Sequence, residues 1–114
     1  MNDDSLPLLQ GTLDILVLKT LGNGPLHGYA VARWIRETTD EALQIEEGAL
    51  YTALHRLEKR GWLKSGWGLS ENNRRAKFYD LTTSGVKQLR KGSQAWARYA
   101  EAISKVLGTP EMVS

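Results

Sequence analysis

The chain has 114 residues, of which 41% are hydrophobic and 25% charged, and it contains no cysteine. This length accommodates one domain with a modest core, and this composition excludes a disordered tail and a disulfide-stapled scaffold. The start MNDDSLPLLQ lacks the basic region of a secretory signal, and no apolar run approaches the roughly 20 residues of a membrane span. We therefore expect a soluble, cytoplasmic globular protein.

The net charge is only +2, but the charges are unevenly distributed. Residues 1–55 hold three Lys or Arg against eight Asp or Glu, which gives −5. Residues 56–77 hold seven against two, which gives +5. A concentrated basic segment favours steering toward nucleic acid. A solvated helix face beside a basic loop is the alternative that charge alone leaves open.

Two amphipathic helices are predicted first. The spacing of Leu13, Leu16, Val17 and Leu21 predicts a helix over Thr12–Leu21. Because this helix is apolar on most sides, we expect it to be central or to lie at a subunit interface. Gly22 to Pro25 ends it. A second helix is expected over Gly28–Glu37.

The third predicted helix, Glu47–Arg60, separates apolar from polar positions. Its core stripe has the spacing i, i+3, i+4, i+7 and consists of Leu50, Ala53, Leu54 and Leu57. A helical wheel places a small and basic set on the opposite side, namely Gly48, Thr52, His55, Arg56 and Lys59. Tyr51 lies on the flank between the two faces.

A hairpin and a long helix follow. Residues Trp62–Leu69 and Ala76–Thr82 favour strands, and the polar segment between them, which carries Arg74 and Arg75, favours a turn. A last helix is capped by Thr82 or Thr83 and extends to Gly108. Its heptad seam comprises Val86, Leu89, Ser93, Trp96, Ala100, Ile103 and Leu107.

This order predicts a mainly α (α+β) fold, a winged helix-turn-helix with a two-stranded wing and a long C-terminal dimerisation helix. We assign 1–83 to the winged helix-turn-helix domain, 84–108 to the dimerisation helix and 109–114 to a flexible tail. The seam is too long to be buried on so small a domain, so a second copy of the helix is expected to cover it.

Four segments in this order resemble the PadR-like family of winged-helix transcriptional regulators. They are LLQGTLDILVLKTL, GPLHGYAVARWI, EEGALYTALHRLEKRGWL and SENNRRAKFYDLTTSG, and they span about residues 8–107. The lengths of the wing and tail are similar to the short-tailed branch with one dimerisation helix. The resemblance implies a dimer that usually represses transcription, and some relatives respond to small aromatic molecules. Relatives often carry Ser or Thr and then Pro at Ala49 and Thr52, so base preference is expected to differ.

The predicted DNA contacts fall into three groups. On the third helix, Gly48 and Ala49 let the backbone approach phosphate, and Thr52 and His55 face base edges. Tyr51, Arg56 and Lys59 are expected at phosphates, and the family resemblance implies the same for Tyr51. On the wing, the predicted contacts are Lys64, Arg74, Arg75 and Lys77. At the start of the second helix they are His27 and Tyr29. The bland alternatives are packing for Tyr51 and Tyr29, capping for His27, and simple solvation for Lys59 and the wing arginines.

The predicted dimer interface combines the heptad seam with Leu13 and Leu16 of the first helix. Trp96 is either a packing residue of this interface or, as the resemblance implies, a face on which an aromatic effector stacks. No cofactor, metal site or enzyme activity is expected, because two separated histidines and no cysteine offer little for catalysis or metal ligation.

The sequence therefore predicts a sequence-specific, homodimeric DNA-binding repressor for a near-palindromic operator, released by a small aromatic effector. Two alternatives are an adaptor that binds protein instead of DNA and a protein that acts mainly as a small-molecule sensor. The basic segment argues against the adaptor.

Overall fold

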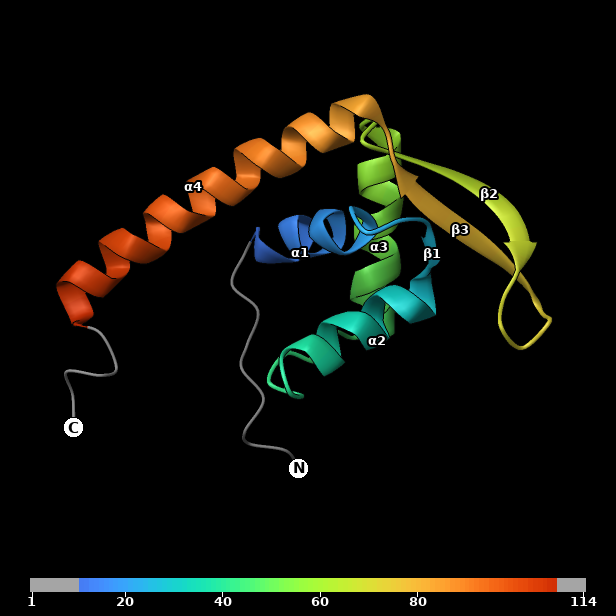
Figure 1. Cartoon of the computed structure of the whole chain (residues 1–114), viewed down its shortest axis with the longest axis horizontal. Coiled ribbons are helices and arrows are strands. Elements are labelled where there is room, and N and C mark those ends of the chain that lie inside the picture. The colour runs from blue at the N-terminus through green and yellow to red at the C-terminus, as the bar shows by residue number, and fades with distance from the viewer. Residues whose placement is uncertain (1–10, 109–114) are drawn as a thin grey trace.

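A computed structural model describes residues 11–108 of the chain (Figure 1). The elements in chain order are α1 (Thr12–Leu21), β1 (Leu26–His27), α2 (Gly28–Thr38), α3 (Glu47–Lys59), β2 (Leu63–Leu69), β3 (Arg75–Leu81) and α4 (Thr83–Leu107). The predicted helices and hairpin strands agree with these bounds to within one residue. The predictions for the first ten residues and for the tail 109–114 lie outside the described residues.

The core lies where α1, α2 and α3 meet. Helix α1 is central, as its broad apolar surface predicts, and Val17, Leu18 and Leu21 are at most 2% exposed. Helix α3 presents its predicted stripe to this core, and α2 contributes Val31 and Ile35. Figure 1 shows α3 crossing behind α1, with α2 below and the β2–β3 hairpin projecting away from the three helices.

The predicted two-stranded wing is present as the β2–β3 hairpin, and β1, which the sequence analysis did not predict, adds a third strand to the sheet. Strand β1 pairs antiparallel with β3, with Leu26 opposite Tyr79 and His27 opposite Phe78, and the strand order is β1-β3-β2. A two-residue strand has no periodicity that a sequence reveals, and it forms because β3 offers it backbone partners. Because α2 begins at the residue after β1, the pairing of β1 with β3 connects the start of α2 to the wing.

The N-terminal end of helix α4 follows β3, and from there the helix extends away from the rest of the domain (Figure 1). Thr82 caps the helix by accepting from the Gly85 N–H at 3.0 Å, as predicted, and donates to the Gly61 carbonyl at 2.6 Å. Gly85 packs so closely on Trp62 that a Cβ there would overlap the Trp62 carbonyl oxygen. These contacts fix the direction in which α4 departs. Among the described helices, none combines the length and apolarity that crossing a membrane requires.

Candidate nucleic-acid interface

The face of α3 opposite the core is solvent-exposed, as the helical wheel predicts. Its exposed residues are Gly48, Ala49, Tyr51, Thr52, His55 and Lys59. Nothing lies within 4 Å of a Cβ built at Gly48, so the first turn is open to a close approach. Small side chains at the helix start followed by Thr and His suit a helix that enters a groove.

Arg56 is the exception on this face of α3, because its side chain is 40% exposed and has a partner within the domain. Its guanidinium is half-buried and forms an ion pair with Asp14 of α1. Arg56 follows Ala53 of the core stripe by three residues and so lies beside that stripe on the helix surface, from which its long side chain reaches across to α1. Arg56 is therefore committed within the domain and holds α3 to α1.

Lys77 is also held by an acidic partner. Its Nζ lies 3.5 Å from Glu58 Oε1 of α3, and the other Glu58 oxygen accepts from Ser65 Oγ at 2.6 Å. Glu58 thus joins α3 to both strands of the hairpin. In contrast, Lys64, Arg74 and Arg75 are exposed and have no ion pair among residues 11–108.

The two wing arginines do not occupy equivalent positions. Arg74 lies in the loop, as predicted, whereas Arg75 begins β3 opposite Leu69. The Arg75 guanidinium lies over the Trp67 ring at 4.7 Å from its centroid. Trp67 is 63% exposed, so its ring lies on the surface of the hairpin and not in the core. Stacking on an aromatic face orients the guanidinium and leaves its N–H edges available.

His27 caps α2, which is one of the two roles that the sequence analysis gave for it, the other being a DNA contact. Its Nδ1 accepts from the Ala30 N–H at 3.3 Å, so the ring carries its hydrogen on Nε2, which lies 3.2 Å from Glu71 Oε1. The ring is 9% exposed and meets Phe78 edge-on at 5.4 Å. Tyr29, one residue into the helix, is 58% exposed and does not pack in the core.

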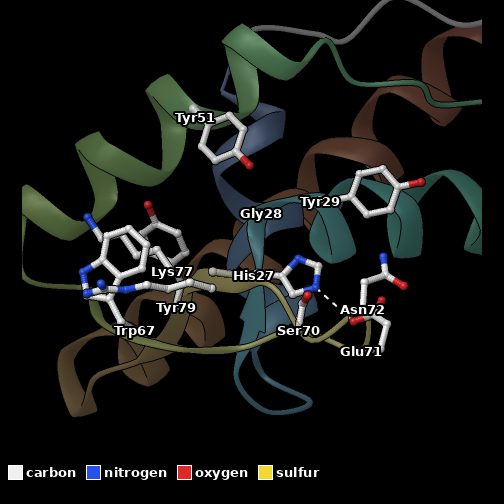
Figure 2. Close-up of a pocket in the computed structure, with 12 residues that line it drawn as sticks. His27, Gly28, Tyr29, Tyr51, Trp67, Ser70, Glu71, Asn72, Lys77 and Tyr79 are labelled. Carbon is white, nitrogen blue, oxygen red and sulfur yellow. Dashed lines mark hydrogen bonds and ion pairs between the residues drawn. The ribbon is translucent and has the colours of Figure 1, made fainter.

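A hollow of about 530 Å³ separates the start of α2, α3 and the wing (Figure 2). Tyr51 points into it from α3, with its hydroxyl directed at Gly28. A Cβ at Gly28 would lie 2.8 Å from the Tyr51 ring, so glycine is what lets the phenol settle there. Burial raises the pKa of Tyr51 above its ordinary value, and the nearby charge of Glu47 raises it further.

Five of the predicted DNA-contact residues line this hollow, namely His27, Tyr29, Tyr51, Arg75 and Lys77. The other predicted contacts lie outside it, and two residues that the sequence did not single out, Glu71 and Arg33, join the wing to α2 beside it. Glu71 of the wing loop contacts His27, and its second oxygen lies 3.4 Å from Arg33 Nη2 of α2. The pKa of Glu71 is lowered, first by its own backbone N–H and then by the His27 hydrogen bond. Separations of 38 and 44 residues leave no sequence signal for these contacts.

The predicted dimer seam is mostly exposed, with one correction. Val86, Trp96, Ile103 and Leu107 are between 40% and 75% exposed, and Ser93 is exposed as well. Leu89 instead packs against the core of this chain, beside Gly22 at the C-terminal end of α1. Leu13 and Leu16 are half-buried against the same core, and Ala100 is half-buried on α4.

A second hollow, of about 720 Å³, lies between α1 and α4. Trp96 and Tyr99 line it from α4, with ring centroids 5.7 Å apart, and Ile15 and Leu18 line it from α1. Gly92 allows the two helices to approach closely, because a Cβ at this position would lie 2.6 Å from Ile15 Cδ1. Trp96 therefore borders an apolar hollow as well as the seam.

These features define a winged helix-turn-helix protein with a long C-terminal helix. The family model described as "Transcriptional regulator PadR-like family" matches residues 17–91. A solved transcriptional regulator from Clostridium thermocellum is 35% identical with a TM-score of 0.76, covering 84% of this chain and 90% of that one. A PadR family transcription regulator from Clostridium difficile is 31% identical with a TM-score of 0.75, covering 86% and 100%. An uncharacterized protein from Lysinibacillus sphaericus is 28% identical over 96 residues, 84% of this chain and 88% of that protein.

The chain belongs to the PadR-like family of transcriptional regulators. The resemblance recognised from its four sequence segments is thus confirmed, as is the winged-helix fold. Members of this family are regulators and not enzymes.

Replacing Gly28 by Ala should displace the Tyr51 phenol, because the new methyl group occupies the space of the ring. Solvent then reaches the hydroxyl, so the pKa of Tyr51 should fall toward its ordinary value of 10.0. Titration of the tyrosine ring signals by NMR, assigned with Tyr51→Phe, measures it. Gly66→Ala is the control, since nothing lies within 4 Å of a Cβ there. An unchanged Tyr51 titration in Gly28→Ala would contradict the close contact.

Proposed function

We propose that this transcriptional regulator is a homodimer that binds a near-palindromic operator and represses transcription in the cytoplasm. The observation that carries the proposal is the single surface formed by the exposed face of α3, the start of α2 and the wing. Two α3 helices enter successive major grooves, and the wings contact the flanking backbone. Binding a protein partner alone does not require an exposed helix face that begins with small side chains and lies beside a basic wing.

Affinity in this proposal comes mainly from the uncommitted cations. Lys59 lies on exposed α3, and Lys64, Arg74 and Arg75 extend the positive charge along the wing. Arg56 and Lys77 contribute less than their positions in the sequence imply, because each is paired with a carboxylate. Thr52 and His55 are proposed to contact bases, and Tyr51 and Tyr29 to contact phosphates.

Replacing both Arg74 and Arg75 by Ala should weaken binding to all duplexes by a similar factor and flatten its salt dependence. Each lost phosphate contact reduces the slope of log K against log salt by about 0.9. Fluorescence anisotropy with operator and unrelated duplexes at several salt concentrations measures both effects. Lys91→Ala with Lys105→Ala removes the same charge from α4 and serves as the control. A slope equal to that of the control would show that the wing does not reach the phosphates.

Thr52→Ala and His55→Ala should change sequence preference rather than general affinity. A well-made base contact contributes roughly 1–3 kcal/mol of discrimination, which disappears only at the base pair concerned. Binding selection from a randomised duplex library reports this change position by position. Lys59→Ala is the control, because a phosphate contact carries no base preference. Identical preferences in all variants would exclude this face of α3 as the base-reading surface.

Dimerisation through α4 is supported by the exposed apolar seam. Apolar side chains at a/d spacing gain stability when a partner helix covers them. Leu13 and Leu16 of α1, which are half-buried, are proposed to belong to the same interface.

Ile103→Glu should convert the dimer into a monomer, because a charge in the seam loses its hydration when the partner helix covers it. Ala102→Glu adds the same charge one residue away, off the seam, and should leave the dimer intact. Sedimentation equilibrium of both variants and the unchanged protein measures the molecular mass. A monomeric unchanged protein, or equal masses for all three, would argue against this interface.

Release by a small aromatic effector is supported by the apolar hollow between α1 and α4. A planar compound that enters this hollow has the Trp96 and Tyr99 rings to stack on, and it contacts both the dimerisation helix and the central helix. Binding there is coupled to the DNA-reading surface if it changes how α4 leaves the domain.

Planar aromatic compounds should therefore quench tryptophan fluorescence, and Trp96→Leu should reduce the quench to the part that comes from Trp62, which also lines the hollow. Trp34→Phe is the control, because Trp34 lies on α2 and does not line this hollow. The same titration followed by operator anisotropy tests release. A quench of the same size in Trp96→Leu as in the unchanged protein would place the compound elsewhere and leave the DNA-binding proposal untouched.

A further inference from the structure

The hollow that faces DNA in the proposed function contains a carboxylate. Among the described residues that line it, Glu71 is the only acidic one, and Arg75 and Lys77 line the same space. A fixed negative charge at this place repels the phosphates of an approaching duplex. Its presence in the hollow therefore calls for a physical explanation.

Both oxygens of Glu71 have donors on the neighbouring elements. Oε1 lies 3.2 Å from His27 Nε2 at the end of β1, and Oε2 lies 3.4 Å from Arg33 Nη2 on α2. Figure 2 shows the Glu71 side chain beside the His27 ring, at the end of the hollow farthest from Trp67. The carboxylate is thus bound as an anionic ligand would be, across two separate elements.

The two donors are held in place independently of Glu71. The His27 ring is fixed by the Ala30 N–H on one side and by Phe78 at its edge. The Arg33 guanidinium lies over the Tyr29 ring, with its Cζ 5.5 Å from the ring centroid. The Glu71 side chain, in contrast, is 53% exposed and belongs to the loop between β2 and β3. The carboxylate can therefore leave, while the donors keep their geometry.

Carboxylates and phosphates accept hydrogen bonds from the same donors in similar geometries. The first two residues of α2, Gly28 and Tyr29, also line the hollow, and the N-terminus of a helix favours a nearby anion. The site consequently has the chemistry of a phosphate site and an occupant that imitates phosphate.

We propose that His27 and Arg33 form a phosphate-binding site, that Glu71 occupies it in the DNA-free protein, and that a backbone phosphate displaces the carboxylate on binding. This inference rests on the proposed DNA-binding function. In the free protein the carboxylate joins the wing loop to α2. On the operator, the phosphate takes over both donors and the loop separates from α2.

Glu71→Gln tests the exchange, because the amide keeps the shape and removes the charge. Operator binding should become about two- to fivefold tighter, the range set by the strength of exposed ion pairs. Glu47→Gln is the matched control, since it removes one exposed negative charge from the start of α3 outside the hollow. The gain from Glu71→Gln should exceed the gain from Glu47→Gln.

Arg33→Gln separates displacement from general electrostatics. In this background there is no complete site to vacate, so Glu71→Gln should add only what Glu47→Gln adds. Gains that are equal for the two glutamates in the unchanged background would overturn the proposal. A loss of affinity in Glu71→Gln, with unchanged thermal unfolding, would overturn it too, because it would make the loop contact a requirement for binding.

Inorganic phosphate tests the site without DNA. In Glu71→Gln, the NMR signals of the His27 ring and the Arg33 Nε–H should shift at lower phosphate concentration than in the unchanged protein, and Arg33→Gln should abolish the His27 shift. Equal titrations in both proteins would overturn the site. If phosphate binds there but no variant binds duplex DNA, the DNA-binding proposal fails and the anion site stands. If all variants bind DNA but neither Glu71 test succeeds, only this inference fails.

Discussion

The geometry of the site depends on the short pairing between β1 and β3. Two residue pairs fix the end of β1 to the wing, and α2 begins at the next residue. His27 lies at this junction and takes part in three contacts. Its backbone belongs to the β1–β3 pairing, its Nδ1 caps α2, and its Nε2 contacts Glu71 of the wing loop. Without this pairing, the start of α2 loses its backbone connection to the wing, and only side-chain contacts such as those of Glu71 and Phe78 join the two.

Charge in this protein is divided between structural and accessible groups. Arg56 and Lys77 join elements of one subunit, so they stabilise the relative positions of α1, α3 and the hairpin. Arg75 is oriented by the exposed Trp67 ring and leaves its donors free. The segment 56–77 therefore presents fewer unpaired basic side chains than its composition implies. Those that remain are concentrated on the wing and the exposed face of α3.

In the proposed function, the long helix α4 connects the dimer interface to the face of α3 that contacts DNA. Its first turns are held rigidly by Thr82 and by the close approach of Gly85 to Trp62, while Gly92 brings its middle against α1. Beyond that point its apolar residues are exposed. In the proposed dimer, a small change in how α4 packs on α1 alters the separation of the two α3 helices, which is the quantity that a near-palindromic operator measures.

The sequence by itself determined the helices, the hairpin, the apolar stripe of α3 and the family, because periodicity and turn chemistry are local properties. The exposed face of α3 and the capping role of Thr82 could also be predicted, since each depends on neighbours in the chain. Only the tertiary structure decided that β1 joins the sheet, that Arg56 turns to Asp14, that Leu89 packs on its own core and that Trp67 supports Arg75. It alone brought Glu71 to His27 and Arg33. These contacts join side chains and backbone segments of different elements, and such partners are chosen by how the elements pack, which no local pattern in the chain encodes.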